Sequence, residues 1–258
     1  MNETRVFLIS GAASGLGLAT AERALTEGHR VMLADIAAEA GQAQAERLAQ
    51  QYGDRVAFHA LDVTDASQAQ AAVAATVARF GRLSHAVNCA GVAPAEKVVG
   101  KEGAHDLARF ARTVNINLVG TFNVLRCAAE AMARNAPDAH GERGLIVNTA
   151  SVAAFDGQVG QAAYAASKAG VAGLALPVAR ELARHAIRVM TIAPGIFMTP
   201  MVQGMPQNVQ DALAASIPFP QRLGQAHEYA DLVMHLCENR YLNAETIRLD
   251  GAVRMNAR

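Results

Sequence analysis

Short apolar runs alternate with helical patterns along the whole chain, and this alternation constrains the fold more than any other feature. The first run, RVFLIS (5–10), is continuous, contains β-branched residues and precedes a glycine-rich turn. Such a run is expected for a strand that is buried on both faces of a parallel sheet. Similar runs follow at 29–35, 55–63, 83–91, 144–151, 187–195 and 246–251.

Helical patterns separate these runs, at about 18–28, 38–52, 66–80, 104–114, 117–135, 162–185 and 225–238. Alternation of this kind predicts an α/β fold of the Rossmann type, a doubly wound parallel sheet of about seven strands with helices on both faces. Pro177 lies inside the long pattern at 162–185, where it removes a backbone hydrogen bond and is expected to bend or locally break the helix. No repeat, low-complexity tract or linker-like run appears, so residues 1–258 are predicted to form one domain.

Composition argues against several classes of function. The formal net charge is zero and no basic block is present, so nucleic-acid binding has no electrostatic support. The three cysteines form no CxxC motif and the eight histidines show no metal-ligand spacing, so we expect reduced thiols and no bound metal. No apolar stretch approaches the ~20 residues of a membrane span, and the N-terminus has the features of neither a signal nor a transit peptide. We therefore expect a cytoplasmic protein with no membrane partner.

The glycine-rich turn after the first strand is a candidate phosphate-binding element. It reads SGAASGLG and contains Gly11, Gly15 and Gly17. Glycine permits a tight turn and lets backbone N–H groups approach a pyrophosphate at the N-terminus of the next helix. The spacing GxxxGxG differs from the GxGxxG of many dinucleotide folds, but its position between a strand and a helix favours the same interpretation. An ordinary tight turn is the alternative.

Acidic residues end the next two predicted strands. Asp35 follows Gly17 by 18 residues, where a carboxylate accepts hydrogen bonds from the ribose hydroxyls of NAD and repels the 2′-phosphate of NADP. No basic residue occurs among the next four positions, so the sequence favours NAD as cofactor. Asp62 ends the third strand and is a candidate for the adenine amino group, with Val63 packing against the ring. Helix capping is the alternative for both carboxylates, and Asp65 competes with Asp62 for that role.

Three further groups are predicted to converge on the same edge of the sheet. The segment NCAG (88–91) ends the fourth strand with small residues that let a flat ring pass close to the backbone, and Ser151 ends the fifth strand. Tyr164 and Lys168 lie four residues apart on the next helix, so their Cβ atoms are about 5–6 Å apart on one face. A lysine cation there can lower the pKa of a tyrosine toward neutrality. Together with the glycine turn, this convergence indicates a proton-transfer site.

The combination of GAASGLG, NCAG, Ser151, YAASK (164–168) and Pro194–Gly195 resembles the short-chain dehydrogenase/reductase family along the whole chain. The segments FDGQVGQAAYAASKAG, IRVMTIAPGIFMTP, PFPQRLG and IRLDGAVRM are similar to one branch, the type II 3-hydroxyacyl-CoA dehydrogenases, also called 17β-hydroxysteroid dehydrogenases type 10. Members of that branch are NAD-dependent tetramers. The resemblance therefore implies a homotetramer that oxidises 3-hydroxyacyl-CoA to 3-oxoacyl-CoA with NAD, as in fatty-acid metabolism.

The resemblance also implies roles for individual residues. Tyr164, as a phenolate, removes the substrate hydroxyl proton while hydride passes to the nicotinamide, and Ser151 orients the substrate oxygen. Lys168 holds the nicotinamide ribose and lowers the pKa of Tyr164, while Asn117, rather than its neighbour Asn115, supports a water-linked proton relay. The implied cofactor contacts are Gly11, Ser14, Gly15, Leu16, Gly17, Asp35, Asp62, Val63, Cys89, Ala90, Gly91, Tyr164, Lys168, Pro194, Gly195, Phe197 and Thr199, the last for the nicotinamide carboxamide. Cys89 departs from the asparagine usual in the broad family, whereas the hydroxyacyl-CoA branch itself has cysteine there.

The segment 196–217 is expected to cover the mouth of the site. Its methionines Met198, Met201 and Met205 suit acyl chains of differing length because methionine is flexible and polarisable. Simple packing against the sheet is the alternative. Gln158 and Gln161 precede Tyr164 and are candidates for hydrogen bonds to a thioester carbonyl, or else are solvated loop residues.

Three other functions remain open from the sequence. A hydroxysteroid or other secondary-alcohol dehydrogenase would use the same chemistry. An NADPH-linked 3-oxoacyl carrier-protein reductase is a second possibility, against which Asp35 argues. A scaffold protein that retains NAD binding is the third, from a different class.

Overall fold

The computed structural model describes residues 4–101 and 103–257, without the side chain of Met201. Within these ranges, seven strands form one parallel sheet in the order β3-β2-β1-β4-β7-β8-β9. The strands are β1 (Val6–Ser10), β2 (Arg30–Asp35), β3 (Val56–Ala60), β4 (His85–Asn88), β7 (Gly144–Thr149), β8 (Ile187–Pro194) and β9 (Thr246–Leu249). The predicted doubly wound α/β fold is confirmed.

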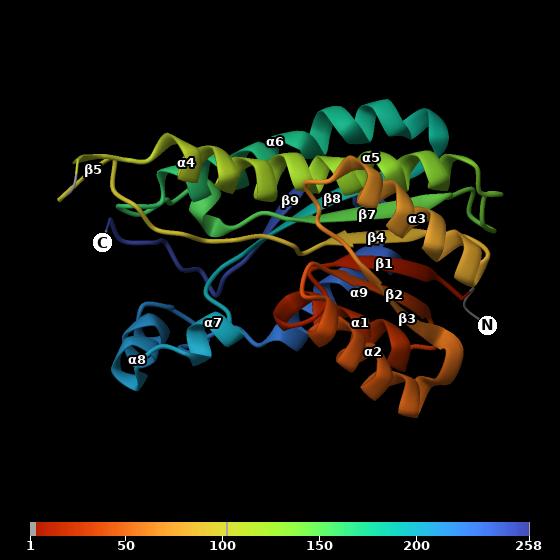
Figure 1. Ribbon diagram of the computed structural model, residues 1–258, viewed down its shortest axis with the longest axis horizontal. Coiled ribbons are helices and arrows are strands. Elements are labelled where there is room, and N and C mark those ends of the chain that lie inside the picture. The colour runs from red at the N-terminus through yellow and green to blue at the C-terminus, as the bar shows by residue number, and fades with distance from the viewer. Residues whose placement is uncertain (1–3, 102, 258) are drawn as a thin grey trace.

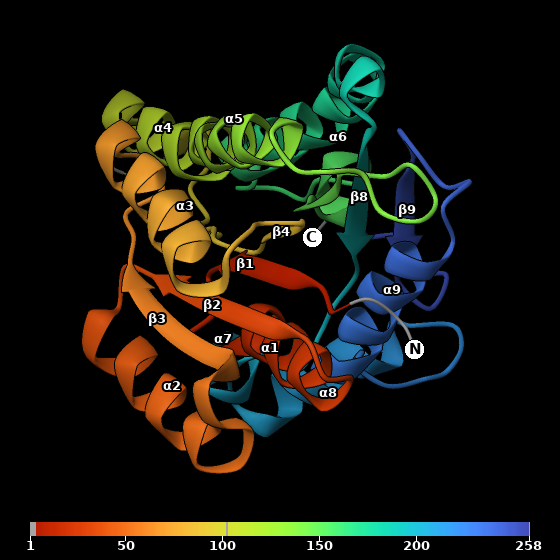
Figure 2. The ribbon, with the colours of Figure 1, turned by 90° about the vertical axis from the view of Figure 1, so that its right-hand side faces the viewer.

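Helices cover both faces of the sheet (Figures 1 and 2). One face carries α1 (Gly15–Thr26), α2 (Ala38–Tyr52) and α9 (Ala226–Glu238), and the other carries α3 (Ala66–Phe80), α4 (Leu107–Val114), α5 (Gly120–Ala133) and α6 (Ala162–Leu182). Successive residues of β1 enter different cores: Phe7 and Ile9 join the cluster that includes Leu25 of α1, whereas Leu8 joins the cluster of α3 and α5. Because both faces are buried, the strands read as continuous apolar runs.

Several elements differ from those predicted. A short antiparallel hairpin, β5 (Val99–Gly100) and β6 (Gly103–Ala104), and the helices α7 (Pro200–Gln203) and α8 (Gln207–Ala215) were not expected. A π-helical turn, Asn115–Val119, joins α4 to α5. The predicted break at Pro177 is wrong, since α6 continues through it. Ala175 and Ala179 are buried on either side of the proline, so their packing outweighs the one backbone hydrogen bond that proline removes.

Among residues 4–101 and 103–257, one helix is long and apolar enough to be a candidate membrane span. It runs from Ala162 to His185, with a mean hydropathy of 1.2 over a window that is 33% buried. A single helix of this kind is weak evidence for a membrane span, because core helices of globular proteins meet the same criteria. Here the helix packs between β8, α4 and the π-helical turn, and it carries Tyr164 and Lys168.

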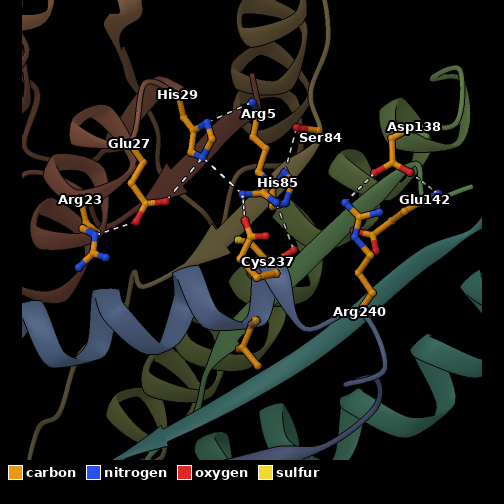
Figure 3. Close-up of polar contacts among 12 residues, drawn as sticks. Arg5, Arg23, Glu27, His29, Ser84, His85, Asp138, Glu142, Cys237 and Arg240 are labelled. Atoms are coloured by element: carbon orange, nitrogen blue, oxygen red, sulfur yellow. Dashed lines mark hydrogen bonds and ion pairs between the residues drawn. The ribbon is translucent and has the colours of Figure 1, made fainter. Parts of the chain in front are cut away.

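A cluster of buried polar side chains lies at the amino ends of the strands (Figure 3). Arg5 forms an ion pair with Glu238 at 2.6 Å, and its guanidinium contacts His29 Nε2 at 3.4 Å. His85 is 6% exposed; its Nδ1 contacts Ser84 Oγ at 2.9 Å, and its Nε2 has no hydrogen-bond partner among the described residues. Burial, reinforced by the charge of Arg5, lowers the pKa of His29 and lowers that of His85 further. Both rings are therefore neutral in the folded protein at neutral pH.

These histidines predict that the free energy of unfolding falls as the pH drops from 7 to 5. In the unfolded chain histidine titrates near pH 6.5, whereas the folded pKa values lie lower. Below pH 6.5 the unfolded state therefore binds more protons, and stability is lost, by at most about 2 kcal/mol per histidine at pH 5. Above pH 6.5 this loss vanishes. Urea unfolding of the wild type at pH 5, 6, 7 and 8 measures the effect.

The matched variants are His85→Gln and, as a control, His140→Gln at an exposed position. His85→Gln is expected to flatten the dependence of stability on pH between 5 and 7, whatever its effect at pH 8. His140→Gln should follow the wild-type curve. If the free energy of unfolding depends on pH equally steeply in the wild type and in His85→Gln, His85 is not the source of the pH dependence.

Candidate active site

The candidate site residues follow strands that end at one edge of the sheet. Gly11 follows β1, Cys89 follows β4, Ser151 follows β7 and Gly195 follows β8, and these four strands are neighbours in the sheet. The chain winds outward from β1 to β2 and β3, then crosses to β4 on the other side of β1. Ligands bind at such a switch point, outside the carboxyl ends of the strands. This edge lies on the left of Figure 1.

The glycine turn has the shape of a phosphate cradle. Gly11 has φ +71°, and a Cβ added there would lie 2.6 Å from the amide nitrogen of Ala90. A Cβ on Gly17 would lie 2.3 Å from the carbonyl oxygen of Gly11. Ser14 is the exposed N-cap of α1, and its side chain makes no capping hydrogen bond. The first N–H groups of α1, which have no partner within the helix, therefore face an open turn suited to an anion.

The two strand-end carboxylates have different surroundings. Asp35 accepts hydrogen bonds from the amides of Ala13 and Ala37, both at 3.0 Å, and thereby holds the glycine turn against β2. It does not cap α2, whose N-cap is Ala37. Asp62 accepts from the amide and hydroxyl of Thr64 at 2.9 and 2.7 Å. The cap of α3 is Asp65, so the capping alternative for Asp62 is wrong.

Val63 is buried beneath α5, where a Cβ added to Gly120 would lie 2.5 Å from Val63 Cγ2. Asn123 on the same helix donates hydrogen bonds to the carbonyls of Val63 and Asp65, at 2.8 and 3.0 Å. Asn123 thus fixes the turn after β3. The sequence analysis did not identify Asn123, because its partners lie about 60 residues earlier in the chain.

Ser151, Tyr164 and Lys168 come together in the structure. Ser151 is 8% exposed and hydrogen bonds to the Tyr164 hydroxyl. Lys168 is 4% exposed; its Nζ donates to the carbonyl of Thr149 at 2.8 Å and lies 5.9 Å from the centre of the Tyr164 ring. A buried hydroxyl, a partly buried phenol and a buried ammonium therefore share one corner.

Asn117 occupies the position behind this corner, whereas Asn115 is exposed. The Asn117 side chain accepts from the amide of Val92 at 2.8 Å and donates to Ser167 Oγ at 3.0 Å. A Cβ added to Gly91 would lie 3.0 Å from Asn117 Oδ1 and 3.4 Å from Lys168 Nζ. Asn117 and Lys168 therefore flank the same glycine, and the choice of Asn117 over Asn115 agrees with its position.

The expected lowering of the Tyr164 pKa by Lys168 is not found. Burial raises the pKa of Tyr164, against a smaller opposing effect of the hydrogen bond from Ser151. Burial also lowers the pKa of Lys168 to about 8. The ammonium points to the Thr149 carbonyl rather than to the phenol oxygen. A phenolate at neutral pH therefore needs a further positive charge beside Tyr164.

The segment after β8 returns to the glycine turn. Gly195 packs against Asp250, which lies 2.8 Å from an added Cβ. The buried side chain of Phe197 packs against Gly224, and a contact of Phe197 with the cofactor stays a prediction. Thr199 is the N-cap of α7, and its Cγ2 lies 4.0 Å from a Cβ added to Gly15. The glycine turn, the carboxylate of Asp35, the small residues 90–91 and Thr199 together fit a nicotinamide dinucleotide.

Comparison with known proteins agrees with this geometry. The family model described as short chain dehydrogenase matches residues 5–210. The chain belongs to the short-chain dehydrogenase family. It is 53% identical to the 3-hydroxyacyl-CoA dehydrogenase type-2 of Bos taurus, over 97% of this chain and 95% of that protein. It is 52% identical to the protein of the same name from Drosophila melanogaster, over 99% of both chains. A crystal structure of 3-hydroxyacyl-CoA dehydrogenase type-2 from Mycobacterium avium superimposes with a TM-score of 0.93, at 42% identity, covering 99% of this chain and 97% of that one.

As a short-chain dehydrogenase, the protein is an oxidoreductase that acts on a small molecule with a nicotinamide cofactor. Within the described ranges, no group of three or more His, Cys, Asp or Glu side chains is placed to hold a metal ion.

A cleft of about 450 Å³ borders the start of α6, the helix that carries Tyr164 and Lys168. It lies between the β5–β6 hairpin and the loop before α6, and is lined by Lys97, Val98, Val99, Gly157, Gln158, Val159, Gly160, Gln161, Ala162 and Ala165. The sequence did not predict the hairpin, because its strands are only two residues long. Lys97 and the exposed valines Val98, Val99 and Val159 are therefore additional candidate substrate contacts.

The glutamines of this loop are not simply solvated. Gln158 donates through Nε2 to the carbonyl of Asn256 at 3.1 Å, and its amide donates to Gln161 Oε1 at 3.0 Å. Both side chains therefore hold the loop in place, and a contact to a thioester carbonyl stays a prediction.

The methionines of the segment 196–217 have unequal surroundings. Met198 packs against the cluster of Val202, Ile217, Leu223 and Val253, which is separate from the sheet cores. Met205 is partly buried at the end of α7, and the side chain of Met201 lies outside the described part of the structure. The segment forms α7 and α8 beside the carboxyl edge of the sheet (Figure 1).

Proposed function

We propose that this dehydrogenase oxidises a 3-hydroxyacyl-CoA to the corresponding 3-oxoacyl-CoA with NAD as hydride acceptor. The observation that carries the proposal is the Ser151–Tyr164–Lys168 corner, together with a cleft that is lined by Lys97 and by Ala162 and Ala165 of α6, the helix that carries Tyr164 and Lys168. Relatives called 3-hydroxyacyl-CoA dehydrogenase type-2, at 50–53% identity over nearly the full chain, support it.

Three side chains contribute to the transfer of the substrate proton, each in a different way. The Tyr164 phenolic oxygen takes the proton of the substrate hydroxyl, and Ser151 Oγ donates a hydrogen bond to the same substrate oxygen. Lys168, whose pKa burial lowers to about 8, is still mostly protonated at pH 7 and supplies positive charge near the phenol. When bound, the oxidised nicotinamide ring accepts the hydride from the hydroxyl-bearing carbon and adds a second positive charge that favours the phenolate.

The cleft suits an acyl-CoA because it combines apolar and cationic side chains. Val98, Val99 and Val159 are 67%, 76% and 53% exposed, so an acyl or pantetheine chain laid against them would bury apolar surface. Lys97 lies in the same cleft and the exposed Lys101 is on the same hairpin, both available to the phosphate groups of coenzyme A.

A substrate comparison tests the proposal. With NAD, 3-hydroxybutyryl-CoA is expected to have a kcat/KM at least about tenfold above that of its N-acetylcysteamine thioester, which lacks the phosphates. Lys97→Ala should lower the ratio of the kcat/KM for the CoA thioester to that for the N-acetylcysteamine thioester. The turnover of the N-acetylcysteamine thioester itself should not change. Turnover of secondary hydroxyls of steroids together with no turnover of any acyl-CoA would favour a hydroxysteroid dehydrogenase instead.

Asp35 predicts a preference for NAD over NADP of about 100-fold or more in kcat/KM, because its carboxylate repels a 2′-phosphate. Asp35→Asn keeps the shape of the side chain and an oxygen that accepts from the amide of Ala13, but it removes the negative charge. The ratio of kcat/KM with NAD to kcat/KM with NADP should therefore fall below about tenfold. Asp62→Asn, at the next strand end, should affect both cofactors alike. Equal use of NAD and NADP by the wild type would contradict the cofactor assignment.

We also infer that the protein is a cytoplasmic homotetramer. Apolar side chains on the outer helices support self-association, with Phe122 of α5 44% and Leu176 of α6 45% exposed. Light scattering after size-exclusion chromatography gives the molar mass, and a monomer at micromolar concentration would contradict the inference.

A further inference from the structure

Three polar side chains from distant parts of the chain meet beneath the carboxyl ends of β4 and β7. Cys89 follows β4, Thr149 is the last residue of β7, and Tyr229 lies on α9. The Tyr229 and Thr149 hydroxyl oxygens are 2.7 Å apart, Thr149 Oγ1 lies 3.6 Å from Cys89 Sγ, and Cys89 Sγ lies 3.7 Å from the Tyr229 hydroxyl. Tyr229 is fully buried and Thr149 is 7% exposed.

These contacts form a closed ring of hydrogen bonds. Thr149 Oγ1 donates to Cys89 Sγ, and the Cys89 thiol donates to the Tyr229 oxygen. Because the Thr149 proton is directed to sulfur, the Tyr229 hydroxyl donates to Thr149. Each group then donates once and accepts once, which satisfies the buried Tyr229 and Thr149 and the partly buried Cys89 and lets the bonds strengthen one another.

Thr149 also links this ring to the catalytic corner. Its carbonyl accepts the hydrogen bond of Lys168 Nζ at 2.8 Å. Lys168 belongs to α6 and Tyr229 to α9, and these helices cover opposite faces of the sheet (Figure 2). The Thr149 side chain therefore hydrogen bonds to Tyr229, which lies on one face of the sheet. The Thr149 carbonyl accepts a hydrogen bond from Lys168, which lies on the other face.

We propose that Tyr229 and Thr149 are positioning residues that hold the Thr149 carbonyl in line with Lys168 Nζ. The role in turnover rests on the proposed function, whereas the positioning of Lys168 does not. A fully buried ammonium depends on well-aligned acceptors, since burial itself disfavours the charge. Among the described residues, Tyr164, Asn117 and the Cys89 thiol also lie near Lys168. Loss of the ring therefore makes the protonated form of Lys168 less favourable.

The chain offers a direct readout, because Lys97, Lys101 and Lys168 are its only lysines. Protein labelled with ¹³C-lysine therefore gives three side-chain signals, and the titration of the Lys168 signal can be followed without substrate or cofactor. In the wild type we expect a midpoint near pH 8. In Tyr229→Phe and Thr149→Val the midpoint should move to lower pH, by roughly threefold or more in the acid dissociation constant.

Two further variants make the test selective. Thr149→Ser keeps a hydroxyl, so the Lys168 midpoint should stay near its wild-type value. Tyr241→Phe removes the hydroxyl of an exposed tyrosine and should leave the Lys168 midpoint unchanged. In turnover, the alkaline limb of the kcat profile, where Lys168 loses its positive charge, should shift to lower pH together with the Lys168 titration, with little change in KM. A purely structural role would lower the unfolding temperature without moving the Lys168 signal.

The outcomes separate the two proposals. An unchanged Lys168 titration in Tyr229→Phe and Thr149→Val overturns the positioning role, even if acyl-CoA is oxidised. A shifted titration in a protein that oxidises no acyl-CoA supports the positioning role and contradicts the proposed function. If Thr149→Val fails to fold, the Lys168 titration is compared between Tyr229→Phe and Tyr241→Phe. A shift in Tyr229→Phe alone supports the positioning role, and no shift in either variant overturns it.

Discussion

Tyr164→Phe is expected to lower kcat by about 10²–10⁴-fold while leaving the Kd for NAD within about twofold of the wild type. The substitution removes the oxygen that accepts the substrate proton but keeps the ring that packs beside Lys168. Ser151 loses its partner, but it remains in place because its Oγ also accepts from the amide of Ala153 at 3.1 Å. Steady-state NADH formation gives kcat, and calorimetry gives the Kd for NAD.

Tyr52→Phe is the matched control. It removes a phenolic hydroxyl on α2 that contacts Thr26 at 3.0 Å, so turnover should be unchanged. Wild-type turnover by Tyr164→Phe would contradict the assignment of Tyr164. A parallel loss of NAD binding would instead indicate damage to the cofactor site.

Gly17→Ala is expected to weaken binding of the nicotinamide cofactor by more than about 100-fold and to destabilise the fold by about 1–3 kcal/mol. The added methyl would lie 2.3 Å from the carbonyl oxygen of Gly11. The neighbour is backbone and cannot rotate away, so the turn must move and its N–H groups lose their arrangement around a pyrophosphate. Calorimetric titration with NAD and thermal unfolding measure the two effects.

Gly173→Ala provides the contrast, because a Cβ at this position of α6 meets nothing within 4 Å. Alanine is favoured over glycine within a helix, so a gain of about 0.5–1 kcal/mol is expected. NAD binding should not change. Normal NAD affinity in Gly17→Ala would show that the glycine turn does not hold the cofactor as proposed.

Features with a local signal were predictable from the sequence. The central strands β1, β4, β7 and β8 are buried along their whole length and are mostly apolar, and the order of apolar runs and helical patterns predicts the doubly wound sheet. Because the carboxyl ends of parallel strands lie at one edge, Gly11, Ser151 and the Tyr164–Lys168 pair could be placed together without a structure.

Other features depend on contacts between distant residues. Tyr229 and Thr149 are 80 positions apart, so no local pattern indicates their hydrogen bond. The raised pKa of Tyr164 results from burial by the surrounding fold, which the i,i+4 spacing with Lys168 does not reveal. The continuity of α6 through Pro177 likewise depends on packing on both sides of the proline.

The proposed function requires Tyr164 to take the hydroxyl proton of a 3-hydroxyacyl-CoA while the hydride passes to NAD. The most direct measurement is the initial rate of NADH formation by the purified wild type from 3-hydroxybutyryl-CoA and longer-chain analogues, with Tyr164→Phe measured in parallel. We expect NADH formation that requires both the thioester and NAD and is lost in Tyr164→Phe. If NAD binds but no 3-hydroxyacyl-CoA of any chain length yields NADH, the proposed function is contradicted.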